Sequence, residues 1–322
     1  MSEPGPEWTF ERVTQHRPVR IIYNPVSGGM IPEAEELRGL LNDLDPELVV
    51  TRGEDEAREA AGGWQSSLLV VAGGDGTVNQ AIKGLGENGF PNDVTFAVLP
   101  MGTGNDLAQT LCIPPDPKRA AEMIRQERVR VLDAARIVSI RTGEVFFINV
   151  ATGGLGMEIS QAADDQELKS RWGRLSYLRA SLEALGDRAA RRIRVTLDGE
   201  GHELPAVSVT VANCRYAGGG WPAAPRANPE DGLLDVVVIK DATASTLTSL
   251  GPRALAKTDY LEDSSVFFGR ASSLSVEADP GIGFTADGEL IGEADEEPVG
   301  FAVIPQAIKV IVGPQYAAQP AR

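Results

Sequence analysis

The sequence predicts two parts: an α/β N-terminal domain with a parallel, doubly wound sheet, and a larger, mainly antiparallel β domain. Its 322 residues are enough for about two domains with separate hydrophobic cores. Strand-like and helix-like segments alternate up to about residue 126, which is typical of a parallel sheet covered by helices on both faces. Beyond Val131 helices become scarce and β-branched runs multiply, which favours an antiparallel sandwich or barrel.

Short turns join the expected elements of the first part, so a helix follows each strand closely. The expected strands are 20–23, 48–51, 67–72 and 95–99. The expected helices are 33–44, 55–61, 77–86, 107–111 and 117–126. This alternation is the pattern of a parallel sheet built from strand–helix–strand units.

Turn signals divide the second part, at Asp198-Gly199, Asp231-Gly232 and Asp287-Gly288. Expected strands are 145–150, 193–197, 206–212, 234–239, 272–277 and 284–286. One long helix is expected at about 167–190, where leucines recur at three- and four-residue spacing. We interpret it as packed on the core with a solvated basic face.

Composition excludes several classes of protein. A net charge of −16 disfavours nucleic acid as a partner, and no apolar run approaches the ~20 residues that a membrane-spanning helix needs. Two cysteines and two histidines give neither a disulfide framework nor a zinc pattern. The acidic N-terminus lacks the features of a secretion signal, so we expect a cytoplasmic protein.

The first motif that can carry chemistry is Gly73-Gly74-Asp75-Gly76-Thr77-Val78-Asn79, between a buried strand and a helix. Glycines at such a junction let backbone N–H groups approach a polyphosphate, and the helix N-terminus adds further donors. A carboxylate cannot bind phosphate directly, so Asp75 indicates an intervening cation such as Mg²⁺. The structural alternative is a plain Asp-Gly turn.

Two further loops end strands on the same predicted edge of the sheet. They are Pro100-Met101-Gly102-Thr103-Gly104-Asn105-Asp106 and Asn24-Pro25-Val26-Ser27-Gly28-Gly29. Because ligands bind at the carboxyl ends of parallel strands, Asp75 and Asp106 are expected to face one site. The alternative for Asp106 is an N-cap of the helix that follows.

In this order and spacing the motifs resemble the diacylglycerol kinase catalytic-domain family, in its soluble bacterial lipid-kinase form. Further matches are Gly153 to Gly156, Glu230 to Asp235 and Ala286 to Glu289, so the resemblance covers about 18–314. It implies an ATP-binding α/β domain over 18–132, completed by 303–314 with a strand at about 308–312. It also implies a β-sandwich lipid-substrate domain over 133–302, with the active site in the cleft between the two.

The resemblance implies a role for each matching residue. The ATP contacts would be Asn24, Pro25, Val26, Ser27, Gly28, Thr51, Gly73, Gly74, Asp75, Gly76, Thr77, Val78, Asn79 and Thr103. Glu289 would deprotonate the lipid hydroxyl, and Asp75 and Asp106 would organise a catalytic Mg²⁺ through water. A second, structural Mg²⁺ would lie beside Asp231, with the carbonyls of Asn228 and Leu233.

Alternatives without a functional role remain for two of these residues. Asp231-Gly232 is also what an ordinary hairpin turn would contain. Glu289 precedes a run of acids, so it could be a solvated carboxylate. The chain also departs from the family pattern at Gly29, where many relatives have a basic residue, and its net charge disfavours attraction to anionic membranes.

The sequence therefore predicts an ATP- and Mg²⁺-dependent kinase of diacylglycerol or a similar lipid, a cytoplasmic protein reaching its substrate at the membrane surface. The resemblance makes a homodimer reasonable. The alternatives are a kinase for a ceramide or sphingoid lipid, an NAD kinase, and a non-catalytic nucleotide- or lipid-binding protein. The second Gly-rich loop and the segment Ala286 to Glu289 favour the lipid kinase.

Overall fold

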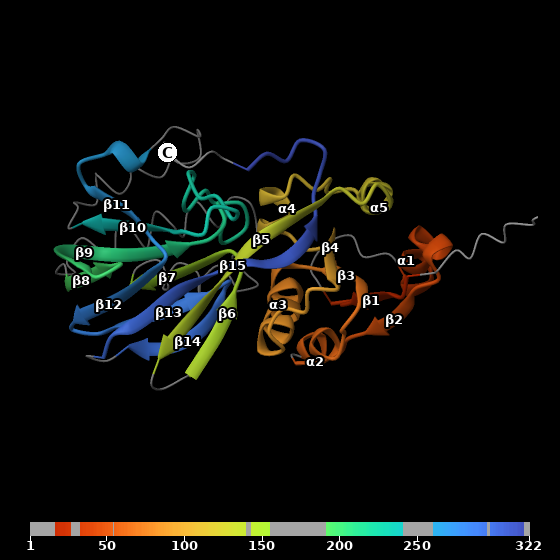
Figure 1. Cartoon of the computed structure of the whole chain (residues 1–322), viewed down its shortest axis with the longest axis horizontal. Helices are drawn as coiled ribbons and strands as arrows, with labels where there is room; N and C mark the ends of the chain where they lie inside the picture. Colours follow the sequence, from red (N-terminus) through yellow and green to blue (C-terminus); the bar gives the residue numbers. More distant parts are fainter. Residues whose placement is uncertain are drawn as a thin grey trace, which may run out of the picture.

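A computed structural model describes residues 17–26, 33–53, 55–139, 143–154, 191–240, 260–294 and 297–318. Its two halves lie side by side along the longest axis: an α/β half and a half made mainly of strands (Figure 1). The predicted fold class is confirmed. The helix expected at 167–190 lies outside the described residues, as do Ser27 and Gly28.

The α/β half is built on parallel strands in the order β4-β3-β1-β2. Their bounds are β1 (Val19–Tyr23), β2 (Glu47–Val50), β3 (Ser67–Gly73) and β4 (Val94–Pro100). β3 and β4 are almost wholly buried, because helices cover both faces of the sheet. This burial explains why their sequences are continuous apolar runs rather than alternating ones.

The helices of this half agree with the predicted segments to within a few residues. They are α1 (Ala34–Leu40), α2 (Glu56–Gly62), α3 (Asp75–Glu87), α4 (Asp106–Thr110) and α5 (Pro117–Arg125), with a 3₁₀ turn at Asn42–Leu44. α2 packs against α3, and α1 packs against α5. α3 also contacts the second half, so it lies on the border between the two halves.

The second half is dominated by antiparallel pairing, which continues from one strand to the next across β14-β13-β7-β9-β8-β12-β15. Its strands are β5 (Val129–Ser139), β6 (Gly143–Phe147), β7 (Val150–Gly154), β8 (Arg191–Leu197), β9 (Glu200–Ala212), β10 (Leu234–Lys240), β11 (Val266–Ala271), β12 (Ser273–Asp279), β13 (Ile282–Ala286), β14 (Glu289–Ala294) and β15 (Val299–Ile311). The side chains between these strands form a core separate from that of the α/β half.

The strand predicted at 145–150 is wrong, because the chain changes partners within it. β6 ends at Phe147 and pairs with β5, whereas β7 begins at Val150 and pairs with β9 and β13. At the break, the N–H groups of Ile148 and Val150 donate to the Asp287 carboxylate instead of to a strand. The apolar run alone could not show this exchange.

β15 connects the two halves. Its first part pairs with β12 and β5, and near its end Lys309 and Val310 pair in parallel with β4. One strand therefore belongs to both the antiparallel network and the parallel sheet. Among the described residues, no helix is long and apolar enough to span a membrane.

Candidate active site

The two predicted glycine loops follow β3 and β4 and lie against each other at the carboxyl edge of the sheet. A Cβ atom on Gly102 would lie 2.6 Å from the Cα of Gly74, and one on Gly104 would lie 2.4 Å from Oδ2 of Asp75. The N–H of Met101 donates to the carbonyl of Gly73 at 2.9 Å. Glycine is therefore needed here for close packing between the loops.

Asp75 holds the two loops together. Its carboxylate accepts the N–H of Asn105 at 2.8 Å and the N–H of Asp106 at 2.6 Å. Asp75 is also the first residue of α3, so the plain-turn alternative is wrong. Its side chain positions the second loop as well as carrying charge to the sheet edge.

The loop after β1 joins the same edge. The side-chain amide of Asn24 donates to Oγ1 of Thr77 at 3.1 Å, and the Asn24 carbonyl oxygen Oδ1 accepts the N–H of Val26. Thr51, at the end of β2, is buried and donates its hydroxyl to the carbonyl of Tyr23. Residues that are predicted to contact the nucleotide, at the ends of three strands, thus lie near one another. Val26 and Thr103, two other predicted contacts, are exposed.

Asp106 points across the border to the second half. Its carboxylate accepts the N–H of Gly219 at 3.1 Å and that of Gly220 at 2.5 Å, so the side chain does not cap its own helix. Burial, and secondly the nearby Asp75 charge, raise the pKa of Asp106 to about 7, although the two N–H donors lower it. The N-cap alternative is wrong, and two carboxylates lie close enough to repel each other.

Glu289, the predicted base, contacts α3. Oε1 accepts the side-chain N–H of Asn79 at 2.9 Å and that of Gln80 at 2.8 Å, and Oε2 forms an ion pair with Lys83. The Glu289 side chain is 35% exposed, so it is not a fully solvated carboxylate of an acidic loop. Among the described residues, the amide oxygens of Asn79 and Gln80 are buried and have no partner, leaving two acceptors beside Glu289.

Asp287 fixes the turn that carries Glu289. Asp287 and Gly288 have φ of 48° and 88°, the left-handed geometry of a tight hairpin between β13 and β14. The carboxylate accepts N–H groups of Ile148, Asn149 and Val150. Burial raises the pKa of Asp287 to about 6, although those donors lower it.

Asp231 lies away from the glycine loops, beside β10 and β11. Its Oδ1 accepts the N–H of Leu233 at 3.1 Å, and its Oδ2 forms an ion pair with Arg270, which also donates to Asp235 at 3.1 Å. Asn228 instead uses its side-chain oxygen to accept the N–H of Glu230. The carbonyl ligation expected for a structural Mg²⁺ stays a prediction.

Charge around Asp231 is compatible with a further cation. Asp231 and Asp235 both form ion pairs with Arg270, and the positive charge of Arg226 also lies near Asp235. Oδ2 of Asp235 is buried and has no partner within the part of the chain that the structure describes, and burial raises the pKa of Asp235 to about 6. The donor set suits a hard cation, with Arg270 as its competitor for Asp231.

The sequence patterns missed four contributors to these sites. They are Lys83, the Gly219-Gly220 loop, Arg270 and Asp133. Asp133 is buried and accepts the N–H groups of Gly232 and Gln306, which ties β5 to the Asp231 turn and to β15. The Gly218-Gly219-Gly220 run was the one available signal, because three successive glycines permit the positive φ angles found there.

A catalytic divalent cation fits the chemistry of the Asp75–Asp106 pair. The described residues include no group of three or more His, Cys, Asp or Glu side chains placed to hold a metal. Mg²⁺ commonly uses only one or two carboxylates, with water and substrate phosphates completing its coordination. Asp106 is buried beside a second acid, so a bound cation would relieve the repulsion between the two carboxylates.

Comparison with known proteins agrees with this architecture. Family models match the two halves separately: the diacylglycerol kinase catalytic domain over residues 18–137, and the YegS C-terminal NAD kinase beta sandwich-like domain over residues 149–312. A crystal structure of a candidate diacylglycerol kinase from Bacillus anthracis superimposes with a TM-score of 0.74 at 25% identity. That match covers 92% of this chain and 98% of the other.

Curated relatives match over most of their length. A diacylglycerol kinase of Mycobacterium tuberculosis H37Rv is 30% identical over 306 residues, covering 91% of this chain and 94% of the relative. That of Bacillus subtilis is 28% identical over 282 residues, covering 85% and 90%. A Pseudomonas aeruginosa PAO1 protein named as YegS-like lipid kinase is 30% identical over 247 residues, covering 76% of each chain.

Fold and site thus define a two-domain protein in which an α/β catalytic domain faces a β-rich second domain. The chain belongs to the diacylglycerol kinase catalytic-domain family, and it is also similar to proteins named as YegS-like lipid kinases.

Proposed function

We propose that this protein is an ATP- and Mg²⁺-dependent lipid kinase that phosphorylates the hydroxyl of diacylglycerol or a similar lipid, giving phosphatidic acid or its analogue. The observation that carries the proposal is the contact of Glu289, at the start of β14, with α3. The N-terminus of that helix holds the two glycine loops together through Asp75, and its middle contacts Glu289 through Asn79 and Lys83. In the proposal, one helix thus positions both the phosphate site and the candidate base.

The glycine loops would bind the nucleotide. Backbone N–H groups and the α3 N-terminus suit phosphate oxygens, and Asn24, Thr51 and Thr77 lie at the adjoining strand ends. In the proposal, Asp75 and Asp106 hold Mg²⁺ through water. When bound, the ion would neutralise the phosphate charge that develops during transfer.

The transfer itself forms a bond from the lipid oxygen to the γ-phosphorus and breaks the bond from that phosphorus to the ADP oxygen. In the proposal, Glu289 accepts the hydroxyl proton as the new bond forms. Its present donors are Asn79 and Gln80 on Oε1 and Lys83 on Oε2. A carboxylate has about four acceptor sites, so the hydroxyl can approach Oε2 beside Lys83.

The second domain would present the lipid at a membrane surface, and we propose peripheral, cytoplasmic action. The same proposal includes the domain boundaries, with the first domain over 18–132 and 303–314 and the second over 133–302. It also includes a structural Mg²⁺ at Asp231, Asn228 and Leu233, and a homodimer. They rest on the resemblance in sequence to the family.

The test is a transfer assay with radiolabelled ATP and purified protein against diacylglycerol, ceramide, sphingosine, monoacylglycerol and NAD. We expect label in a chloroform-soluble product from diacylglycerol or a related glycerolipid, and none after chelation of Mg²⁺. Label in a sphingolipid would change the acceptor, and label in NADP would move the protein to the NAD kinases. Nucleotide binding with no transfer to any acceptor would overturn the assignment as a kinase.

A further inference from the structure

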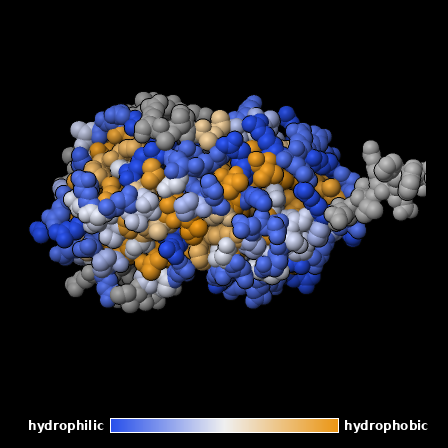
Figure 2. Space-filling view, in the orientation of Figure 1, coloured by the Kyte–Doolittle hydropathy of each residue, from blue (hydrophilic) through white to orange (hydrophobic). Residues whose placement is uncertain are grey.

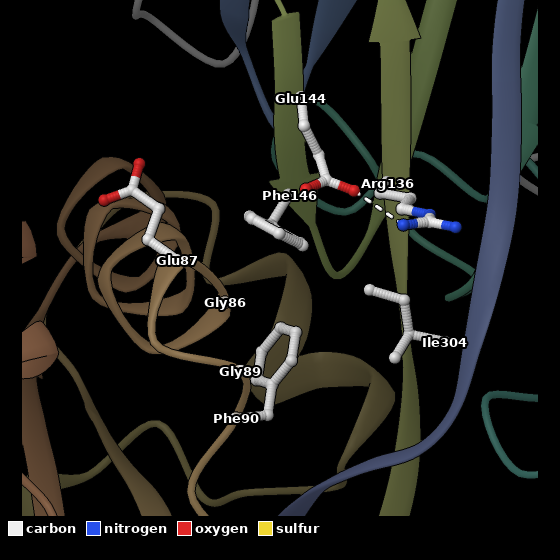
Figure 3. A pocket seen from close by; sticks show the side chains of 8 residues that line it. All are labelled: Gly86, Glu87, Gly89, Phe90, Arg136, Glu144, Phe146 and Ile304. Atoms are coloured by element: carbon white, nitrogen blue, oxygen red, sulfur yellow. Dashed lines mark hydrogen bonds and ion pairs between the residues drawn. The ribbon is translucent and has the colours of Figure 1, made fainter.

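A groove of 450 Å³ lies at the C-terminal end of α3, on the border between the two halves (Figure 3). The end of α3 forms one wall, and side chains of β5, β6 and β15 form the other. It is lined by Gly86, Glu87, Gly89, Phe90, Arg136, Glu144, Phe146 and Ile304. No predicted site residue is among them.

Three apolar side chains, Phe90, Phe146 and Ile304, line the inner part of the groove. Phe90 is 6% exposed, and its ring meets that of Phe146 edge to face with centroids 5.8 Å apart. Ile304 lies on the same wall as Phe146, across the groove from Phe90 (Figure 3). A Cβ on Gly86 would strike the Phe146 ring at 2.4 Å, so this wall is held close to α3 by a glycine.

The charged groups at the rim are already paired. Arg136 donates to Glu144 at 2.7 Å, and Glu87 forms an ion pair with Arg58. The lining therefore offers no unpaired charge that would attract a phosphate or a carboxylate. An uncharged hydrocarbon chain fits such a lining better than a nucleotide does.

The groove continues the face of α3 that carries the candidate active site. Asn79, Lys83 and Gly86 are spaced i, i+4 and i+7, so they share one face of the helix. Gly86 lies about 4.5 Å further along the axis than Lys83 and about 10 Å further than Asn79, at about 1.5 Å per residue. Asn79 and Gly86 are buried, so the second half covers this face of α3. Glu289 contacts the face at Asn79 and Lys83, and the groove adjoins it at Gly86.

Apolar side chains also reach the surface at the border between the two halves. Figure 2 shows them at the level of β6 and α3, two of the elements that line the groove.

We propose that this groove binds an acyl chain of the acceptor lipid while the hydroxyl of that lipid lies at Glu289. The inference rests on the proposed function and adds the position and chemistry of the chain-binding subsite. It predicts that catalytic efficiency rises with acyl length and that filling the groove removes this gain.

The experiment compares wild type with Ile304→Trp, which adds bulk to the groove. Catalytic efficiency is measured with diacylglycerols of increasing acyl length at constant surface dilution in mixed micelles. We expect Ile304→Trp to lose roughly tenfold with long chains, because several buried methylenes lose their contacts, and less than about twofold with the shortest. Glu87→Trp, at the exposed rim, repeats the test if Ile304→Trp folds poorly.

Val131→Trp is the matched control, because Val131 lies on β5 outside the groove and is 41% exposed. It is expected to keep the chain-length dependence of wild type. A wild-type enzyme that phosphorylates lipids, with groove variants that lose nothing or lose equally at every chain length, would overturn the groove alone. Absence of lipid transfer by wild type overturns the proposed function instead.

A direct binding measurement further separates a failure of the groove proposal from a failure of the proposed function. Pyrene-labelled diacylglycerol, titrated without ATP, should bind wild type and Val131→Trp alike and Ile304→Trp at least about fivefold more weakly. Equal affinity for all three would contradict the proposal. So would a selective loss of NAD phosphorylation in Ile304→Trp, because the groove would then hold a nucleotide ring.

Discussion

Glu289 is a carboxylate held by three donors, and in the proposed mechanism it accepts the proton of the lipid hydroxyl. Glu289→Gln retains the shape but cannot accept a proton. We expect near-normal ATP affinity and a kcat lowered by at least about 100-fold, the usual size of a general-base contribution. Transfer kinetics and calorimetric ATP binding measure the two effects separately.

Lys83→Met is the companion variant, since it removes the positive charge and leaves the carboxylate. If Lys83 holds Glu289 in place, its loss should lower kcat less than Glu289→Gln does, because the carboxylate that accepts the proton remains. A Glu289→Gln protein that binds ATP poorly but keeps its kcat would make Glu289 a structural acid.

Arg270 competes with any cation for the Asp231 carboxylate. Arg270→Gln should lower the melting temperature in chelator and enlarge the stabilisation by Mg²⁺, because an ion bound only to the folded state stabilises it by mass action. Thermal melts of both proteins in Mg²⁺ and in chelator measure this. The same Mg²⁺ response in both proteins would mean that no cation uses Asp231.

At the residue scale, the sequence predicted the acids of the site better than their partners. Asp75 and Asp106 could be found because each lies in a glycine-rich turn directly after an apolar strand. Their surroundings could not: Gly219 meets Asp106 although 113 positions separate them, and Lys83 meets Glu289 across 206. Such contacts depend on how the two halves dock, and local patterns carry no information about docking.

In the two loops, we expect one glycine to allow close packing and another to leave room for phosphate, and separate substitutions test the two roles. Gly102→Ala places a Cβ against the backbone of Gly74, so it should destabilise the fold by roughly 1–3 kcal/mol, as overpacking does. Gly76→Ala meets nothing within 4 Å, so stability should hold or rise slightly. Denaturant unfolding of both variants measures the difference.

Gly76→Ala should nevertheless weaken ATP binding, by about tenfold or more, because the added methyl group stands where phosphate would approach the loop. Calorimetry with wild type as reference measures it. Unchanged affinity would remove Gly76 from the nucleotide contacts. A Gly102→Ala protein as stable as wild type would show that the loops separate at little cost.

Elements were predictable where local pattern and environment agree. β3 and β4 are buried apolar runs between turns, and α3 follows a glycine junction, so their existence was clear from the sequence. β5, β11 and β14 were not predicted. β5 carries Arg and Asp residues within its run, and a glycine and an acid follow the short apolar pair of β14. These strands are specified by their neighbours in the sheet more than by their own composition.

Several buried aspartates of the molecule have a higher pKa in the folded protein than in the unfolded chain. Burial raises the pKa of Asp235 and Asp287 to about 6 and that of Asp106 to about 7. Each favours folding most below its unfolded pKa of about 3.9, and this contribution is lost as pH rises through 6 to 7. The melting temperature without Mg²⁺ should therefore fall between pH 5 and pH 8.

Two other effects on stability do not reverse the expected fall in melting temperature. Carboxyls with a lowered pKa, such as Asp43 and Asp198, lose their contribution only when pH falls toward acid, outside this range. The net charge of −16 adds repulsion as pH rises. Differential scanning fluorimetry at constant ionic strength tests the prediction, and Asp287→Asn should flatten the slope. A melting temperature that rises steadily toward pH 8 would contradict it.

Because β15 pairs with strands of both halves, it also determines when the parallel sheet can be completed during synthesis of the chain. Its partner β4 is made early, yet the contact of Lys309 with Asn92 joins positions 217 apart, so the parallel sheet cannot close until nearly the whole chain has left the ribosome. Until then β4 presents an unpaired edge, which is a template for aggregation. A fragment containing the α/β half alone would keep that edge open permanently, so expression trials should retain β15, by permutation or by fusion.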